Sequence, residues 1–311
     1  MTTAETTEHH RTPRKLGLSR ERRAIWEGRP SLPVRALKII IIAAIVIIML
    51  YPFASMIMQS FAGFGANMRA TLIPSKFTLD AYRSILGGGI VTRAMMVSAF
   101  ITIVGTAIAV VLTTTLAYSL TRTKDVPGSK VVLYLVLFTM LFSAGIIPNY
   151  LLVKELGLLD SYWSLIIPTA ISAFNMVVIR NFFMQIPGEL IESARVDGAS
   201  DLAIFARIIL PLSKAPIAVI TLFYAVGYWN SFFNALIYIN SPEKYPIQIV
   251  LNRYVLMGSP LDQIQNPGGV APPPVSIQMA VVVVATIPIL LVYPFAQKYF
   301  AKGVLTGAIK G

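Results

Sequence analysis

The segment Met95–Leu120 reads MMVSAFITIVGTAIAVVLTTTLAYSL and contains no charged side chain. A helix needs about 20 apolar residues to cross the hydrocarbon core of a bilayer, so this segment is long enough to span a membrane. Five more segments have the same apolar character: Leu37–Met58, Val131–Pro148, Tyr162–Ile179, Ala215–Tyr238 and Val275–Gln297. The sequence therefore predicts an all-α, polytopic membrane protein with six transmembrane helices.

The composition of the 311-residue chain also indicates a membrane protein. Hydrophobic residues make up 56% of the chain and charged residues 13%, whereas soluble domains carry about 45–50% and about 25%, which argues against a water-soluble enzyme. Cysteine is absent, and the two histidines, His9 and His10, are adjacent in a polar leader. The body of the protein therefore offers no thiolate nucleophile, histidine base or Cys-ligated metal, and we expect no cofactor in this chain.

The distribution of Lys and Arg predicts the orientation in the membrane. Six spans place both termini on one side, and the loops and ends on that side carry 19 basic residues against seven on the other. Because cytoplasmic loops are enriched in Lys and Arg, both termini are expected in the cytoplasm. The net charge of +12 is interpreted in the same way, and not as a nucleic-acid-binding surface. The expected parts are a basic cytoplasmic leader (1–36), a six-span membrane domain (37–297) and a cytoplasmic tail (298–311).

The predicted spans contain one charged residue, Lys38, at the edge of the first span. Proton- or sodium-coupled carriers usually place ionisable groups at membrane depth, and intramembrane hydrolases need carboxylates, histidines or metal ligands there. The chain also lacks the G-x-x-x-x-G-K-[ST] loop that binds the phosphates of ATP. A transporter with this sequence would therefore take its free energy from a separate ATPase subunit.

The predicted cytoplasmic loop 180–214 is long, and long loops tend to be functional. Pro187 and Glu189 are typical of the first turn of a helix, and Gly198 of its end. Ser200 and Asp201 predict the start of a second short helix that Pro211 would stop. Two short helices could be held by a partner protein, or they could form a connector that packs against the membrane helices, and periodicity alone leaves both alternatives open.

The residues of this loop resemble the EAA loop of ABC-importer permeases. The string Glu192-Ser-Ala-Arg-Val-Asp-Gly-Ala199, followed after eight residues by Ile208-Ile-Leu-Pro211, follows the pattern E-A-A-x-x-D-G-A-x8-I-x-L-P. Ser193 replaces an alanine of the pattern, and Pro216 lies one position later than the proline often found there.

The resemblance extends over nearly the whole chain. Phe223–Leu236 is similar to the fifth span of carbohydrate-importer permeases of the maltose-transporter type, and Phe300–Gly311 to the tail of the second permease of that group. Within the group, the chain looks closest to permeases for complex oligosaccharides, including alginate- and rhamnogalacturonan-type importers.

The resemblance implies a subunit that transports and does not catalyse. The expected partners are a second, homologous permease, two ATPase subunits that hold ATP and Mg²⁺, an extracellular solute-binding protein, an oligosaccharide substrate and membrane lipid. Transport would proceed by alternating access. The implied coupling residues are Glu192, Ser193, Ala194, Asp197, Gly198, Ala199, Leu210 and Pro211. The implied ATPase-contacting residues of the tail are Lys302, Gly303, Gly307 and Lys310, and the glycines predict an extended or irregular tail.

The fifth predicted span and the outer loop after it hold the candidate substrate contacts. Asn230 and Asn234 are four residues apart and would share a helical face; the other candidates are Tyr228, Trp229 and Tyr238. Amides and aromatic faces suit a neutral sugar, but polar side chains in spans also join neighbouring helices. In the loop 239–274, the resemblance implies contact with the binding protein, for which the candidates are Asn266, Gly268 and Gly269; an ordinary exposed loop is the alternative.

Two other functions compete with an importer permease. One is a stand-alone secondary carrier or channel for a small neutral solute, and the other is a membrane-bound enzyme. The scarcity of charged groups in the predicted spans argues against both. Co-purification of an ATPase distinguishes the first function from the other two.

Overall fold

The computed structural model describes residues 32–63, 73–74, 76–87, 89–122, 126–256 and 274–308. The chain forms two compact units, Met1–Pro52 and Phe53–Gly311. The described part of the first unit is helical. Helix α1 (Leu32–Ser60) begins in the first unit and ends in the second, so it starts within the predicted leader. From Ile39 to Leu50 this helix has no polar side chain, so it is apolar on every face, as in a membrane span.

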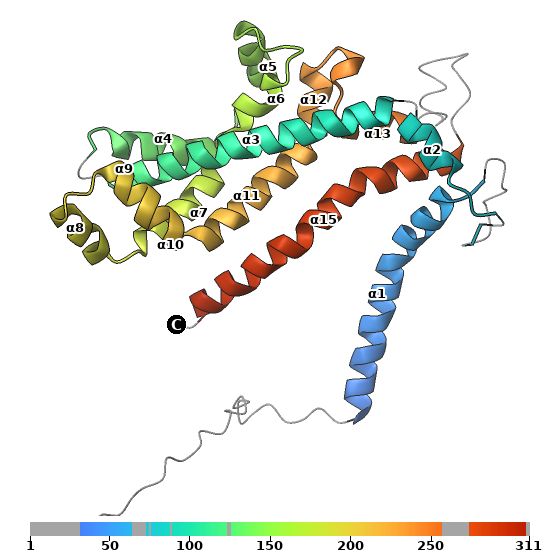
Figure 1. Ribbon diagram of the computed structural model, residues 1–311, viewed down its shortest axis with the longest axis horizontal. Coiled ribbons are helices and arrows are strands. Elements are labelled where there is room, and N and C mark those ends of the chain that lie inside the picture. Colours follow the sequence, from blue (N-terminus) through green and yellow to red (C-terminus); the bar gives the residue numbers. More distant parts are fainter. Residues whose placement is uncertain are drawn as a thin grey trace, which may run out of the picture. The chain divides into compact units, whose positions relative to one another are not determined.

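The second unit is built around helix α3 (Ile90–Thr121), the longest helix whose side chains are described throughout. It extends from α2 (Asp80–Gly87) at one end to α9 (Asp201–Ile204) at the other, as Figure 1 shows. Its most extensive packing is against α11 (Lys214–Trp229) and α7 (Ala173–Met184).

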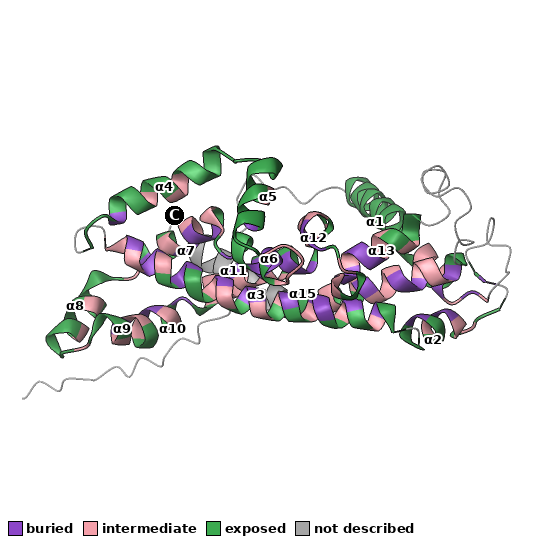
Figure 2. Cartoon of the chain, turned by 90° about the horizontal axis from the view of Figure 1, so that it is seen from above, coloured by how far each residue is buried: buried purple, intermediate pink, exposed green. Residues whose placement is uncertain are grey.

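The core of the second unit consists of three hydrophobic clusters arranged along α3. Val91 belongs to the cluster shared with α2, α13 and α15, Ile101 to a middle cluster, and Leu120 to a third cluster shared with α7 and α9. Buried residues accordingly recur along the whole of α3 in Figure 2. Because one helix contributes to every cluster, α3 connects the two ends of the unit.

The remaining helices are shorter. Their bounds are α4 (Ser129–Leu141), α5 (Ile146–Glu155), α6 (Trp163–Ile166), α8 (Gly188–Val196), α10 (Leu210–Leu212), α12 (Phe232–Tyr238), α13 (Ile247–Leu256) and α15 (Val275–Ala308). Two short 3₁₀ helices, Ile167–Thr169 and Pro242–Lys244, and one π-helical turn, Phe205–Ile209, complete the described secondary structure. Within the described residues, the only β-pairing is an isolated bridge between Ala62 and Phe77.

The described helices do not confirm six continuous spans. Three are long and apolar enough to cross a membrane on their own, namely α1, α3 and the first 18 residues of α15, or five spans if two bent pairs count as one each. The segment predicted as a third span, Val131–Pro148, is divided between α4 and α5 by a break before Ile146, where Gly145 has a φ of 81°. Helix α4 already ends at Leu141, and Gly145 directly precedes α5, where glycine adopts a positive φ without the steric cost that a side chain brings.

Two further predicted spans are also interrupted. The fourth bends by 48° between Thr169 and Ala173, and the fifth is divided into α11 and α12 at Asn230 and Ser231. Helix breaks inside membrane proteins occur where the backbone is buried in protein or lines a cavity, because the freed carbonyl and amide groups need partners. The two interruptions are therefore expected to lie beside a cavity or within packed protein.

Pro211 does not stop its helix as predicted. The helical path continues from α9 through the π-helical turn to Leu212, and it ends at Ser213, where the chain turns by 84° into α11. Proline removes one backbone hydrogen bond and crowds the preceding turn. The wider π-helical turn directly before Leu210 accommodates that mismatch.

The predicted tail also differs from expectation, because its backbone is helical as far as Ala308. Each glycine costs about 1 kcal/mol in a helix, but extending an existing helix avoids the cost of nucleation. Lys302, Gly303 and Gly307 lie on this helix, whose described side chains end at Pro294. Lys310 lies outside the described residues, as do Asn266, Gly268 and Gly269 of the outer loop and most of the leader.

Candidate functional site

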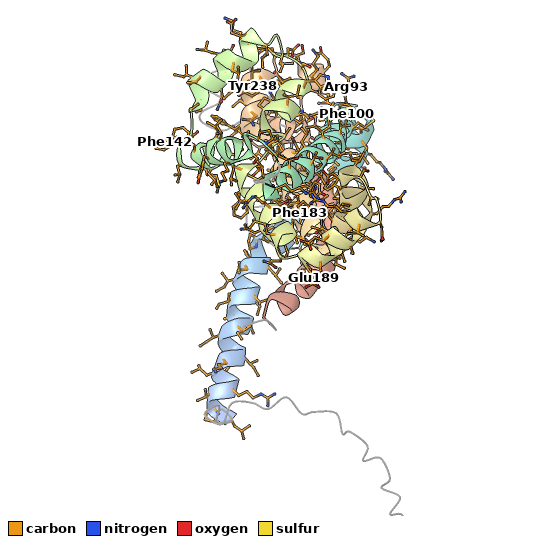
Figure 3. All side chains as sticks on the ribbon, turned by 90° about the vertical axis from the view of Figure 1, so that its left-hand side faces the viewer. Arg93, Phe100, Phe142, Phe183, Glu189 and Tyr238 are labelled. Atoms are coloured by element: carbon orange, nitrogen blue, oxygen red, sulfur yellow. The ribbon has the colours of Figure 1, made fainter. Side chains whose placement is uncertain are left out.

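Helix α8, at the centre of the EAA-like loop, buries none of its residues. Figure 2 shows it as exposed along most of its surface, and Glu189, labelled in Figure 3, is exposed as well. Two large apolar side chains of this loop stand out: Val196 is 88% exposed and Leu202 is 75% exposed. Neither side chain is covered by the described part of the chain, so this surface of the loop is available to a partner.

The turn after α8 is a complete Schellman motif. Gly198 has a φ of 80°, its amide donates to the carbonyl of Arg195, and the amide of Ala199 donates to that of Ala194 at 2.9 Å. Both bonds satisfy carbonyls at the helix end, and the left-handed conformation explains the glycine. The hydroxyl of Ser200 then accepts a hydrogen bond from the amide of Ala203 and caps the next helix. The predicted helix end and cap are thus confirmed.

The predicted coupling residues fall into two groups. Those with exposed side chains or backbone on α8 and its turn are Glu192, Ser193, Asp197 and Gly198, while Ala194 and Ala199 pack against the third cluster beneath. Leu210 and Pro211 lie apart from them and line a separate apolar groove against α3. The EAA-like pattern therefore describes an exposed helix together with the residues that attach it to the membrane helices.

Ion pairs join this loop to the end of α3. Arg122, directly after α3, pairs with Oδ1 of Asp201 and also donates to the hydroxyl of Tyr118. Arg195 on α8 approaches the same Asp201 oxygen to 3.7 Å. The hydrogen bond from Arg122 is the main reason that the pKa of Asp201 is held below its usual value. Sequence reasoning identified Asp201 only as a helix start and missed this contact.

A cavity of about 540 Å³ lies at the two interrupted spans. The residues around it come from the bend between α6 and α7, from α11 and from the break between α11 and α12. They are Thr169, Ser172, Phe174, Asn175, Phe223, Tyr224, Gly227, Tyr228, Asn230, Ser231, Phe232, Phe233 and Asn234. This mixture of hydroxyls, amides and aromatic rings can bind a polyhydroxylated ligand, because sugars offer hydrogen-bonding rims and apolar faces.

Three of the five predicted substrate-pathway residues line this cavity, namely Tyr228, Asn230 and Asn234. The two asparagines do so from opposite sides of a helix break, and not from one continuous helical face as predicted. The hydroxyl of Ser231, at the break, has no hydrogen-bond partner within the described residues. The break therefore concentrates polar groups at the cavity.

Trp229 and Tyr238 do not line the cavity. Trp229 is 6% exposed and its indole N–H donates to the carbonyl of Ala285 on α15 at 3.2 Å. Tyr238 is also 6% exposed and stacks with Tyr150 on α5. Helical rotation explains the outcome for Trp229, because a residue adjacent to Tyr228 faces about 100° away from it.

Sequence reasoning missed the contribution of the bend between α6 and α7. Thr169, Ser172 and Asn175 bring polar groups to the cavity from that bend. The signal was present in the sequence, since Pro168 lies inside an apolar segment and three polar residues follow it within seven positions. A proline followed by small polar residues is typical of an interrupted membrane helix.

Two tyrosines of α11 fix the geometry of the cavity wall. The hydroxyl of Tyr224 lies 2.6 Å from Oγ1 of Thr113 on α3 and accepts a hydrogen bond from the amide of Ser172 at 2.9 Å. The hydroxyl of Tyr228 donates to the carbonyl of Ile166 at 3.1 Å. These bonds satisfy backbone groups that the bend leaves free, so the bend and α11 hold each other in place.

Asp160, between α5 and α6, organises a second set of polar contacts. This residue has a φ of 56°, which is uncommon for a residue with a side chain. Its carboxylate accepts hydrogen bonds from the amides of Asn240 and Ser241, and from Nζ of Lys244 at 2.8 Å. The bond from Lys244 is the main cause of a strongly lowered Asp160 pKa, and it raises the pKa of Lys244 in turn. The carboxylate thereby holds the chain between α12 and α13.

A helical membrane protein with a polar cavity between interrupted helices, and an exposed helix in a long loop, has the features of a transporter subunit that docks a partner. The chain belongs to the family of binding-protein-dependent transport system inner membrane components, whose profile matches residues 127–306. Members of this family are permease subunits of ABC transporters and not enzymes.

Curated relatives and a solved structure agree with the family. The polygalacturonan/rhamnogalacturonan transport system permease protein YtcP of Bacillus subtilis (strain 168) is 50% identical over 269 residues, which cover 85% of this chain and 94% of the relative. Protein LplC of the same organism is 50% identical over 270 residues, covering 85% and 90%. A crystal structure of a bacterial ABC transporter involved in the import of the acidic polysaccharide alginate matches with a TM-score of 0.80 and 28% identity, covering 89% of this chain and 100% of that chain.

Proposed function

We propose that this chain is one of two permease subunits of an ABC importer, which moves an oligosaccharide into the cytoplasm by alternating access. The observation that carries this proposal is the exposed helix α8, which buries no residue and leaves Val196 bare beside the Schellman turn. Docking on a partner would remove this apolar side chain from water, which is favourable. Two ATPase subunits, which bind ATP and Mg²⁺, are the partners that would cover it.

The chemistry of the cavity supports a carbohydrate substrate. Its polar groups are hydroxyls and amides, and its apolar surface is aromatic, as at Phe174 and Phe232. The relatives named for polygalacturonan, rhamnogalacturonan and alginate favour an oligosaccharide derived from a complex polysaccharide. The second permease subunit would complete the pathway, and an extracellular binding protein would deliver the sugar to it.

The contacts between loops support the proposed division of the loops between two sides of the membrane. Arg122 and Asp201, which belong to two loops assigned to the cytoplasm, form an ion pair. Asp160 and Lys244, which belong to two loops assigned to the outside, form another. Each pair joins loops on the same side of the proposed membrane. We propose that the helices form six spans with both termini in the cytoplasm, that the end of α15 contacts the ATPases, and that the loop with Asn266, Gly268 and Gly269 faces the binding protein.

The test is reconstitution of the complete importer. The chain is co-expressed with a candidate second permease and ATPase, purified through a tag on this chain, and placed in proteoliposomes with the binding protein. We expect the ATPase to co-purify and labelled oligogalacturonide or a related oligosaccharide to accumulate only with ATP. Uptake by this chain without an ATPase would contradict the proposal and favour a stand-alone carrier.

A further inference from the structure

Three charged side chains from three different elements meet at Asp201. Arg122 follows the end of α3, Arg195 lies in the last turn of α8, and Asp201 is the first residue of α9. The contact between α3 and the loop is reinforced by Tyr118, whose ring lies 4.9 Å from that of Phe205 and whose hydroxyl reaches the carbonyl of Asp201 at 3.4 Å. The Asp201 carboxylate thus pairs with one side chain on α8 and with another that directly follows α3.

The side chains of Arg122 and Asp201 differ in how far they are buried. The side chain of Arg122 is 10% exposed, whereas that of Asp201 is 68% exposed. The guanidinium group of Arg122 also lies 4.6 Å from the centre of the Tyr118 ring. A nearly buried guanidinium group needs a partner, because an uncompensated buried charge costs far more free energy than an exposed one. Among the described residues, Asp201 therefore cannot move away from the end of α3 without removing the carboxylate with which the nearly buried Arg122 pairs.

The central helix carries this connection to the cavity. Along α3, Thr113 contacts the hydroxyl of Tyr224, and Gly105 lies against the ring of Tyr228. Both tyrosines line the cavity. Helix α3 is therefore attached at its end to the EAA-like loop (180–214), hereafter the docking loop, and in its middle to the cavity wall. A displacement of that end would move groups at the cavity.

We propose that the Arg122–Asp201 ion pair positions the docking loop on α3, so that a displacement of α8 by the ATPase reaches the cavity through α3 as well as through the covalent connection from α10 to α11. Arg122 and Asp201 are positioning residues in this proposal, and neither contacts the sugar. The proposal rests on the proposed function, because it requires an ATPase bound at α8. It predicts that the ion pair sets the efficiency of coupling and not the assembly of the complex.

The test compares Asp201→Asn, Arg122→Gln and the double variant in the reconstituted importer. We expect the number of sugars imported per ATP hydrolysed to fall by about 2- to 30-fold in each single variant, the range found for residues that mediate coupling. The double variant should be no worse than the more affected single variant, because both changes remove the same contact. Asp201→Glu, which keeps the charge, should restore most of the ratio, and Arg207→Gln, at an exposed basic residue of the same loop, is the matched control.

Three results would overturn this inference. They are an unchanged import ratio in both single variants, additive losses in the double variant, and a loss of import that is fully explained by reduced recovery of the ATPase. The last would assign the ion pair a purely structural role. Recovery of the ATPase with the unmodified chain is measured in the same preparations, and failure there would contradict the proposed function itself.

Discussion

The ring of Tyr228 on α11 lies directly against the backbone of Gly105 on α3, where a Cβ atom would lie 2.9 Å from Cζ of the ring. The hydroxyl of this tyrosine donates to the carbonyl of Ile166, next to the bend between α6 and α7. Only glycine allows such a close approach of ring and backbone. The position of one cavity-lining residue therefore depends on the absence of a side chain on a neighbouring helix.

Gly105→Ala should displace the Tyr228 ring and destabilise the protein. Overpacking of this kind costs about 1–3 kcal/mol, and the altered cavity wall should also lower sugar uptake. Thermal unfolding in detergent and ATP-driven uptake measure the two effects. Gly87→Ala is the control, because a Cβ atom there meets nothing within 4 Å. Equal behaviour of the two variants would show that the ring is not held by Gly105.

Asn234 and Trp229 should respond differently to substitution although both were predicted to contact the sugar. Asn234→Ala should raise the sugar concentration needed for half-maximal uptake, because Asn234 lines the cavity. The stability of the protein should change little. Trp229→Phe should reduce stability by roughly 1–3 kcal/mol, since it leaves the buried carbonyl of Ala285 without its indole donor. Uptake per folded transporter should be unchanged in Trp229→Phe. Altered uptake in Trp229→Phe together with unaltered uptake in Asn234→Ala would mean that the cavity is wrongly assigned.

Asp160→Asn should lower the unfolding temperature near pH 7 by removing the charge that pairs with Lys244. Because the pKa of Asp160 is lower in the folded protein than in the unfolded chain, its stabilisation is fully present above the unfolded pKa, about 3.9. It is lost as the pH falls through the folded pKa. The difference between variant and unmodified protein should therefore be constant from about pH 5 up to the alkaline range in which Lys244 loses its proton, and it should shrink in more acidic solution.

The control for this experiment is Asp80→Asn, which removes an exposed pair with Arg83 at 3.6 Å. Exposed pairs of this kind contribute little to stability. A difference of the same size in both variants would show that the Asp160 contacts do not hold the chain between α12 and α13.

Single cysteines report the orientation, because the chain contains none of its own. A cysteine at Ser259, in the outer loop, should react with a membrane-impermeant thiol reagent added to intact cells. A cysteine at Ser200, in the EAA-like loop, should react only after the cells are opened. The opposite labelling pattern would place the termini outside the cell and contradict the distribution of Lys and Arg.

The sequence predicted the helical membrane fold, because long apolar segments are a direct consequence of the bilayer as a solvent. Gly198 and Ser200 were assigned correctly to a helix end and a cap because those roles depend on local geometry. The helix breaks at Gly145 and Asn230 were missed, because each lies in a segment whose apolar composition is typical of one continuous span.

Tertiary packing also explains why some predicted substrate contacts do not line the cavity. Trp229 and Asn230 are adjacent in sequence, but only tertiary packing shows that one contacts α15 and the other a cavity. The ion pair between Arg122 and Asp201 joins positions 79 residues apart. No pattern within a single helix contains information about such a contact.

The central claim is that an ATPase docks on α8, and site-specific crosslinking tests it most directly. In the assembled importer, Val196→Cys is compared with Val126→Cys, whose position precedes α4 and is 39% exposed. A short bifunctional thiol–amine reagent should join the ATPase to the chain through position 196 and not through position 126. Crosslinking at position 126 alone, or no difference between the two positions, would contradict docking at α8.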